Sequence, residues 1–498
     1  MDELVSFCKK TGFVFPSGEI YGGLAGFWDY GPYGVEVKRA IKNSWWETFV
    51  RGREDVYGID GTTITHPKIW EASGHTESFS DPLVDCRKCK ERVRADHLVE
   101  DELKIAADGL SLEKLAKIID EKGLKCPKCG GELTEARQFN LMFKTHIGPI
   151  EDETSVAYLR PETAQLIFAD FKLVAECMRA KLPFGIAQIG KGYRNEISPR
   201  NFVFRCREFE MMELEYFIDE DELHNCPWVD EISGIEVQFY SAEMQEKKKE
   251  TEWMTFGEAL EKKIIKTGWH AYWLAKQYEW CVGLGLGKKN LRLRQHLPDE
   301  RSHYALDTWD IDYNFDFGWK EIHGMANRTT FDLSQHEKFS GEKLRLFNQE
   351  KKEHVLPYVA AEPSWGVGRL FLALMSEAFQ KQEDGDVVLR LDRRVAPVKV
   401  AVFPLVRKEQ FKEKAREIVK SLGKFGCQYD ESGSIGRRYR RQDQIGTPLC
   451  ITVDKQTLED ETVTVRERDS REQRRVKIDD LEEKITLFLD SRVDFEGF

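Results

Sequence analysis

The spacing of apolar residues first predicts an amphipathic helix over residues 35–50. Its large apolar side chains stand four positions apart, at Val37, Ile41, Trp45 and Phe49. An α-helix turns once every 3.6 residues, so side chains at this spacing share one face. A strand-like run, GTTITHPKIW, follows at 61–70.

Further along, the pattern predicts strands with helices between them. Residues 156–218 combine strand patterns with one helix, strands return at 308–333, and a helix opens within EPSWGVGRLFLALMSEAF at 362–379. The stretch LSLEKLAKIIDEKG, at 110–123, also has a helical pattern. Residues 220–300 are charged and helix-rich, and we predict a helical insertion there.

Near residue 395 the pattern changes. The apolar run VKVAVFPLV predicts a buried strand, and the charged stretch at 407–426 predicts a helix that ends at glycine. LCITVD and TVTVRERD predict further strands. This order of strands and helices is typical of a small α/β domain with a partly parallel sheet.

A charged strand carries the first candidate chemistry. If residues 209–217 form a strand, one face holds Phe209, Met211, Glu213, Glu215 and Phe217, because side chains alternate along a strand. Carboxylates beside apolar groups are costly unless a cation pairs with them.

The neighbouring strand, expected at 187–196, would point Arg194 and Glu196 together. An arginine, a carboxylate and an aromatic face suit the phosphates, the exocyclic amine and the flat base of ATP. A two-stranded ribbon laced with cross-strand ion pairs is the alternative.

A second cluster is EPSWGVGR, at 362–369. Glu362 precedes small, turn-forming residues, and Arg369 stands at the start of a predicted helix. Glycines allow a ligand to approach the backbone closely, and a helix N-terminus attracts phosphate. The alternative is an ordinary glycine-rich turn into a helix.

The helix at 35–50, with the strand-like run that reaches Pro67, resembles the first motif of the class II aminoacyl-tRNA synthetases, here about 35–67. The two clusters resemble the second and third motifs, here about 187–217 and about 362–378. Further stretches are similar to the glycyl-tRNA synthetase family in particular: YLRPETAQ (158–165), DPLVDC with RADH (81–97), HGMANRTTFDL (323–333) and RYRRQDQIGTPLCITVD (438–454). The resemblance covers nearly the whole chain.

This resemblance implies a fold and a division of the chain. We expect an α/β (α+β) fold: a mixed, largely antiparallel sheet flanked by helices, at 1–80 and 150–395, as the catalytic domain. Residues 81–149 would be an insertion, 220–300 a helical insertion, and 396–498 an α/β anticodon-binding domain. The apolar helix with Trp45 and Trp46 resembles a dimer interface, so we expect a homodimer. An intramolecular core is the alternative for these tryptophans.

The activity implied by the resemblance is glycine–tRNA ligation. Glycine would be activated with ATP and Mg²⁺ to glycyl-adenylate and pyrophosphate, then transferred to the 3′ end of tRNA(Gly). A noncatalytic paralogue on the same scaffold, such as the accessory subunit of mitochondrial DNA polymerase, and a class II synthetase for another amino acid are the alternatives. A degenerate relative should have lost some of the motif residues, and this chain retains them.

The resemblance also implies the site residues. Arg194 and Arg369 would be catalytic, Phe209 would stack under adenine, and Glu321 would help to hold Mg²⁺. The expected ATP contacts are Arg194, Asn195, Glu196, Phe204, Arg205, Phe209, Glu321, Ile322, Gly366 and Arg369. The expected glycine or substrate contacts are Arg94, Glu162, Phe209, Glu210, Met211, Met212, Glu213, Arg328, Glu362, Pro363, Ser364, Trp365 and Gly366.

Two cysteine pairs indicate a metal site. Cys86 and Cys89, then Cys126 and Cys129, form two C-x2-C pairs separated by 36 residues. Four thiolates suit tetrahedral zinc, although zinc ribbons usually have a spacer of about 15–20 residues. We predict structural Zn²⁺, and four unmetallated cysteines in a loop are the alternative.

Charge and composition bear on partners and location. The net charge of −12 argues against a protein that coats nucleic acid nonspecifically. GRRYRRQDQ nevertheless gathers Arg437, Arg438, Arg440 and Arg441 around a tyrosine, and the family resemblance favours contact with the tRNA anticodon over a solvated charged face. The first residues, MDELVSFCKK, lack an apolar signal core, so we expect a cytoplasmic protein without membrane association.

Overall fold

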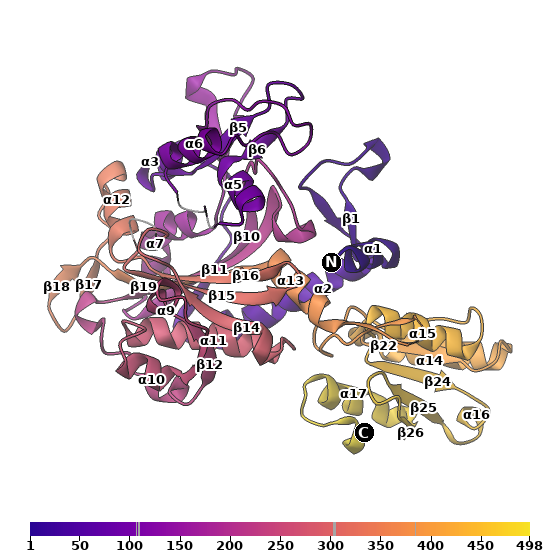
Figure 1. Cartoon of the computed structure of the whole chain (residues 1–498). Helices are drawn as coiled ribbons and strands as arrows, with labels where there is room; N and C mark the ends of the chain where they lie inside the picture. Colours follow the sequence, from indigo (N-terminus) through magenta and orange to yellow (C-terminus); the bar gives the residue numbers. More distant parts are fainter. Residues whose placement is uncertain (106, 108–109, 302–304, 384) are drawn as a thin grey trace.

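The computed structural model describes residues 1–498 except 106, 108–109, 302–304 and 384. Its larger part is built on a nine-stranded sheet in the order β13-β12-β14-β15-β16-β19-β11-β10-β3 (Figure 1). The strands are β3 (Val56–Ile59), β10 (Phe184–Tyr193), β11 (Glu208–Ile218), β12 (Glu236–Tyr240), β13 (Glu252–Thr255), β14 (Leu291–Gln295), β15 (Asp307–Phe315), β16 (Gly318–Asn327) and β19 (Tyr358–Gly366). Among the described strands of this sheet, only β10 with β3 and β12 with β14 pair in parallel, so the predicted mixed, largely antiparallel sheet is confirmed.

Helices cover this sheet. They are α2 (Pro32–Trp46), α7 (Ala164–Met178), α11 (Gly268–Gly283), α12 (Phe331–Ser340) and α13 (Val367–Ala378). Shorter elements are α1 (Asp2–Thr11), β1 (Val14–Pro16), β2 (Trp28–Tyr30), β4 (Ile64–Thr65), α3 (Pro67–Ala72), α4 (His75–Ser78), β8 (Phe143–His146), β9 (Val156–Leu159), α8 (Val229–Ile232), α9 (Ala242–Glu246), α10 (Phe256–Glu261), β17 (Leu346–Asn348), β18 (Glu353–Val355), β20 (Phe379–Lys381) and β21 (Val387–Leu389). Among the described residues, no helix has both the length and the apolarity needed to cross a bilayer.

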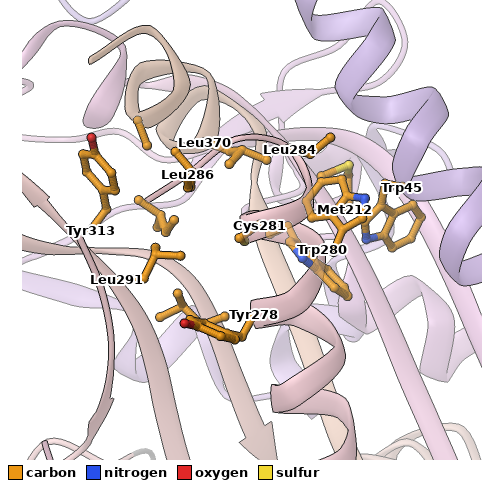
Figure 2. Packing of buried hydrophobic residues seen from close by; sticks show 14 of the residues in the cluster. Trp45, Met212, Tyr278, Trp280, Cys281, Leu284, Leu286, Leu291, Tyr313 and Leu370 are labelled. Atoms are coloured by element: carbon orange, nitrogen blue, oxygen red, sulfur yellow. The ribbon is translucent and has the colours of Figure 1, made fainter. Parts of the chain in front are cut away.

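The predicted helix over 35–50 is confirmed, and its apolar face is buried within the chain. Helix α2 continues as one π-helical turn, Glu47–Arg51. The Trp45 ring is fully buried and packs against Trp365 with ring centroids 5.3 Å apart. Figure 2 shows Trp45 beside Met212 and Trp280 in this core. Trp45 is therefore a core residue of the single chain, which is the alternative that its sequence left open.

Residues 220–300 differ from the predicted helical insertion. They do contain helices α8 to α11, but they also supply β12, β13 and β14, which extend the main sheet. Trp269 and Trp273 of α11 are buried in the same core as Trp45. The charged residues of this segment lie on its exposed side. They interrupt the apolar pattern by which short strands are predicted from sequence.

A smaller unit forms around the first cysteine pair. It contains β5 (Ser80–Asp85), β6 (Arg92–Arg94), β7 (Arg137–Asn140), α5 (Ala95–Leu103) and α6 (Leu112–Glu121). The helix predicted over 110–123 is confirmed, and the Ser111 side chain caps its first turn. Val84, Leu98 and Leu115 belong to a core of this unit's own.

The C-terminal residues form a second α/β unit, at the lower right of Figure 1. Its sheet has the order β23-β22-β24-β25-β26. The elements are β22 (Val400–Pro404), α14 (Glu409–Ser421), β23 (Gln428–Tyr429), α15 (Ile435–Ile445), β24 (Leu449–Val453), α16 (Thr457–Asp460), β25 (Thr462–Glu467), β26 (Gln473–Lys477) and α17 (Leu481–Leu489). Strand β22 is parallel to both β23 and β24, as the pattern predicted. The buried residues here form a hydrophobic core separate from that of the large sheet.

Candidate active site

A cleft of about 360 Å³ opens over strands β11, β16 and β19 of the large sheet. Alternation along the strands decides which side chains face it. On β11 these are Phe209, Met211 and Glu213 at alternate positions, with Glu210 as a further lining residue; on β19 they are Glu362, Ser364 and Gly366. Antiparallel pairing aligns Glu213 with Ser364 and Met211 with Gly366, so the two strands present one joint surface.

The same alternation corrects three predicted substrate contacts. Met212, Pro363 and Trp365 do not line the cleft, because they occupy the intervening positions and point to the other face of the sheet. Met212 and Trp365 are fully buried in the core, with Trp365 against Trp45. Successive motif residues of one strand thus alternate between lining the cleft and packing in the core.

Glu213 is a buried carboxylate of the cleft that Thr163 and Ser364 hold in place. Its side chain is 2% exposed. Oε2 accepts hydrogen bonds from the Thr163 backbone N–H, at 2.8 Å, and from the Thr163 hydroxyl, while Oε1 accepts one from the Ser364 hydroxyl at 3.1 Å. Burial and the nearby Glu162 raise the pKa of Glu213.

Glu162 enters the cleft from the loop before α7. Its Oε2 lies 3.2 Å from His75 Nε2, and Gln165 Nε2 donates to Oε1 at 3.3 Å. Burial alone would raise the pKa of Glu162, but His75, Arg328 and Arg194 lower it well below its usual range. Glu162 is therefore an ionised carboxylate near neutral pH.

Glu362 closes the same end of the cleft. Its Oε1 accepts a hydrogen bond from Arg328 Nη1 at 2.6 Å, and Arg328 also forms a two-point ion pair with Asp332. Burial raises the pKa of Glu362 to about 8, since Glu213 and Glu162 oppose the effect of Arg328. Carboxylates that raise one another's pKa favour a bound cation, and an ammonium group offers three donors to such a set.

The other end of the cleft carries arginines and an aromatic ring. The Arg194 guanidinium lies over the Phe209 ring, 5.2 Å from its centroid, and Nε donates to the Pro161 carbonyl at 3.1 Å. Strand β10 ends at Tyr193, so Arg194 and Glu196 lie in the loop beyond it, not on the predicted strand. They still line the same cleft.

Arg205 is held at this end by three acceptors. Nε donates to Glu196 Oε2 at 2.7 Å, Nη1 lies 3.3 Å from His97 Nε2, and Nη2 lies 3.4 Å from Asp81 Oδ2. Asp81 and His97 come from the unit around β5. That unit therefore helps to position a cleft arginine.

Arg369 reaches the cleft from the first turn of α13, as predicted. Nη1 forms an ion pair with Glu321 Oε2 at 2.9 Å, and the guanidinium lies over the Phe204 ring at 4.7 Å. Burial would raise the pKa of Glu321, but Arg369 lowers it to about 2. Ile322, which follows Glu321 on β16, also lines the cleft.

Two other predicted contacts, Arg94 and Asn195, are corrected. Arg94 is 6% exposed and does not line the cleft, because Asp81 and Asp96 bind its guanidinium. Glu210 does line the cleft, and Lys38 and Lys42 of α2 contact its carboxylate at 2.5 and 2.6 Å. Asn195 lies outside the cleft, and its backbone N–H donates to the Leu141 carbonyl.

Sequence reasoning missed other residues of the cleft. Asp310 of β15 lines it and is 3% exposed. Its Oδ2 accepts from Arg294 at 2.7 Å and lies 2.8 Å from His296 Nε2. Thr163, which orients Glu213, and His75, which contacts Glu162, were missed as well. The alternating acids of DTWDIDYNF were a usable signal for Asp310, whereas Thr163 and His75 carry none without the fold.

The four paired cysteines converge in the unit around β5. Cys86 and Cys129 Sγ atoms lie 3.6 Å apart, as do those of Cys89 and Cys126, and all four lie within 4.8 Å of one another. Tetrahedral zinc with Zn–S bonds of about 2.3 Å requires sulfur separations of about 3.8 Å. The sulfur atoms therefore fit zinc.

The C-terminal arginines differ in accessibility. Arg437, Arg440 and Arg441 of α15 are exposed, with Arg440 near Asp386 and Arg441 paired with Asp430. Arg438 is 2% exposed, and its Nη atoms donate to the Pro404 and Gly433 carbonyls at 2.5 and 2.9 Å. Arg438 is therefore corrected from a predicted anticodon contact to a structural residue.

Comparisons with known proteins cover nearly the whole chain. A family model described as an anticodon binding domain matches residues 399–486. The glycine–tRNA ligase of Caldanaerobacter subterraneus subsp. tengcongensis is 47% identical over 97% of this chain and 98% of its own length. Those of Thermobifida fusca and Geobacillus thermodenitrificans are 44% and 46% identical, over 97% and 99% of this chain and 96% and 98% of theirs.

Proposed function

The chain belongs to the glycine–tRNA ligase family of class II aminoacyl-tRNA synthetases, and we propose that the cleft over β11 and β19 is where it activates glycine. It uses ATP to form glycyl-adenylate with release of pyrophosphate, and then transfers the glycyl group to the 3′ end of tRNA(Gly). The noncatalytic alternative is not favoured, because Arg194, Glu213 and Arg369 all line one cleft.

The glycine ammonium group would bind among Glu162, Glu213 and Glu362. Glycine has no side chain to grip, so this charge must supply much of its binding energy. The single observation that carries the proposal is the buried Glu213, which Thr163 and Ser364 orient toward the cleft. A larger amino acid would place a β-carbon against these walls, and overpacking of that kind costs about 1–3 kcal/mol or more.

ATP would occupy the arginine end. Phe209 offers a flat face for adenine, Glu196 an acceptor for its amino group, and Arg194, Arg205 and Arg369 the charge for the phosphates. Family similarity gives these roles, and the shared lining of the cleft supports them.

The activation step joins two anions, so charge is its main obstacle. The glycine carboxylate attacks the α-phosphorus, the bond to the β-phosphate oxygen breaks, and pyrophosphate leaves. No side-chain base is needed, because the carboxylate is already ionised. Arg194 and Arg369 would stabilise the negative charge that develops on the α-phosphate oxygens. Mg²⁺, which would supply further positive charge to the phosphates, would be held by Glu321 and Asp310, whose carboxylates are hard oxygen ligands.

Pyrophosphate exchange with each of the twenty amino acids tests the function. We expect exchange with glycine alone. Exchange with a different amino acid would favour a class II synthetase of other specificity, and absence of exchange with every amino acid would favour the noncatalytic paralogue.

We propose that Cys86, Cys89, Cys126 and Cys129 hold one structural zinc ion. We expect about one zinc per chain in purified protein, measured by atomic absorption. Replacing Cys126 with serine should lower both the zinc content and the melting temperature of the unit around β5. Cys450, which is buried in the C-terminal unit, provides the matched control, and its replacement should leave the zinc content unchanged. Less than half a zinc per chain in the unmodified protein would reject the site.

We propose that the exposed face of α15 contacts the tRNA anticodon. The double substitution Arg437→Ala and Arg440→Ala should raise the KM for tRNA(Gly) by about tenfold or more, because fewer arginines then neutralise the RNA phosphates. For the same reason, the affinity for tRNA should depend less on salt concentration. Glycine-dependent exchange, which needs no tRNA, should not change. Arg438→Ala should instead lower the melting temperature, since it leaves the buried Pro404 carbonyl and the partly buried Gly433 carbonyl without this donor. An unchanged KM for tRNA in the double variant contradicts the proposed role of this face.

Two further expectations concern assembly and location. We propose a homodimer, which sedimentation at micromolar concentration tests, and a monomer there would remove the proposal. We also propose a cytoplasmic location, consistent with eleven cysteines that form no disulfide among the described residues.

A further inference from the structure

Glu215 is a buried carboxyl group that the proposed reaction leaves without a role. It lies on β11 two residues after Glu213, on the same face of the strand. Its side chain is fully buried, and among the described residues neither carboxyl oxygen has a hydrogen-bond partner. An ionised carboxylate in such a place is so unfavourable that the group takes up a proton instead.

Strand register places Glu215 against the glycine end of the cleft. Glu213 pairs with Ser364 and Tyr216 pairs with Ala361 across β11 and β19. The same register sets Glu215 opposite Glu362. Side chains in directly opposed positions have Cβ atoms about 4.5–5.5 Å apart, and two like charges there destabilise the sheet.

The groups around this pair make a second negative charge still less favourable. Glu213 faces it from β11, Asp332 from α12, and Glu162 from the loop before α7, while Arg328 is the nearby cation. Arg328 already binds both Glu362 and Asp332. Burial and Glu362 raise the pKa of Glu215 well above its usual range.

We propose that Glu215 is a positioning residue, held as a neutral carboxylic acid, which donates its O–H to the Glu362 carboxylate when glycine is bound. The neutral acid adds no charge beside the ion pair of Glu362 with Arg328. Its proton gives Glu362 a charge-assisted hydrogen bond that fixes the carboxylate against the ammonium group. This inference rests on the proposed function.

Two substitutions of similar size separate the proposal from simple space filling. Glu215→Gln keeps a neutral group with an N–H donor, and we expect the KM for glycine to stay within about threefold of the unmodified protein. Glu215→Leu fills the same space without a donor, and we expect that KM to rise about tenfold, in line with the loss of one charge-assisted hydrogen bond. The KM for ATP should stay unchanged in both variants.

Infrared spectroscopy provides a second measurement that needs no variant to be active. The unmodified protein should show the C=O stretch of protonated, buried carboxyl groups at neutral pH, and Glu215→Gln should remove one component of that band. If Glu215→Gln does not fold, Glu215→Leu replaces it in this comparison, and a band that is the same in the variant and the unmodified protein overturns the proposal.

The kinetic outcomes are equally decisive. A glycine KM raised in Glu215→Gln as much as in Glu213→Gln would mean that Glu215 is an ionised ligand. Equal KM values in Glu215→Gln and Glu215→Leu would mean that it only fills space. Either result overturns the proposal. An unchanged glycine KM in Glu213→Gln would instead refute the proposed glycine site itself, so the two failures can be told apart.

Discussion

Replacement of Arg369 with alanine is expected to lower glycine-dependent pyrophosphate exchange by about 10²–10³-fold, the usual cost of removing one preorganised donor from a developing charge. The side chain projects from the first turn of α13 into the cleft, where Glu321 and the Phe204 ring hold it. Its loss removes a positive charge at the phosphates and leaves Glu321 without its ion-pair partner. Exchange should fall through kcat, with the KM for glycine little changed.

The control for this variant is Arg39→Ala. Arg39 lies on α2, its side chain is 66% exposed, and its ion pair with Glu36 is a surface one. Both variants should melt at similar temperatures. Arg369→Lys should recover only part of the loss, because an ammonium group cannot reproduce the planar fork of a guanidinium. Exchange at the unmodified rate in Arg369→Ala would refute its catalytic role.

Replacement of Glu213 with glutamine should reduce kcat/KM for glycine by about 10²-fold, because a hydrogen bond to a charged group contributes about 1.5–3 kcal/mol and a buried donor loses its acceptor as well. The amide NH₂ of glutamine would meet either the Thr163 donors or the Ser364 hydroxyl. The KM for ATP should change little, since the arginine end of the cleft is untouched.

Glu208→Gln is the matched control on the same strand. Glu208 pairs with Lys191 at the surface, at 2.5 Å, and does not line the cleft. Steady-state exchange with glycine varied at saturating ATP separates the two parameters. If Glu213→Gln and Glu208→Gln gave the same KM for glycine, the ammonium site would have to lie elsewhere.

The part of the site that lies on β11 followed from the sequence. Alternation alone predicted that Phe209, Met211 and Glu213 share a face, because the period of a strand is fixed by its backbone. Applied to β19 as well, the same rule would have excluded Trp365. The prediction of Trp365 came instead from family resemblance, which marks a whole stretch without separating its two faces.

Residues held by distant partners could not be predicted in this way. Arg94 was expected at the substrate, but Asp81 and Asp96 bind it in the unit around β5. Arg438 looked like its exposed neighbours, although α15 turns it inward to two carbonyls. The sequence shows that these side chains are charged. Only the fold shows whether their partner is a ligand, a carboxylate or the backbone.

Strand β19 gives one face to chemistry and the other to the aromatic packing around Trp45. A substitution that loosens that packing would tilt the strand. The Glu362 carboxylate and the Ser364 hydroxyl, on its opposite face, would move with it. Loss of activity in a randomly mutated population would therefore often originate in the interior rather than at the reactants. Selection for faster turnover and selection for a more stable fold therefore act on the same nine-residue strand. A large change in one of these two properties would also change the other.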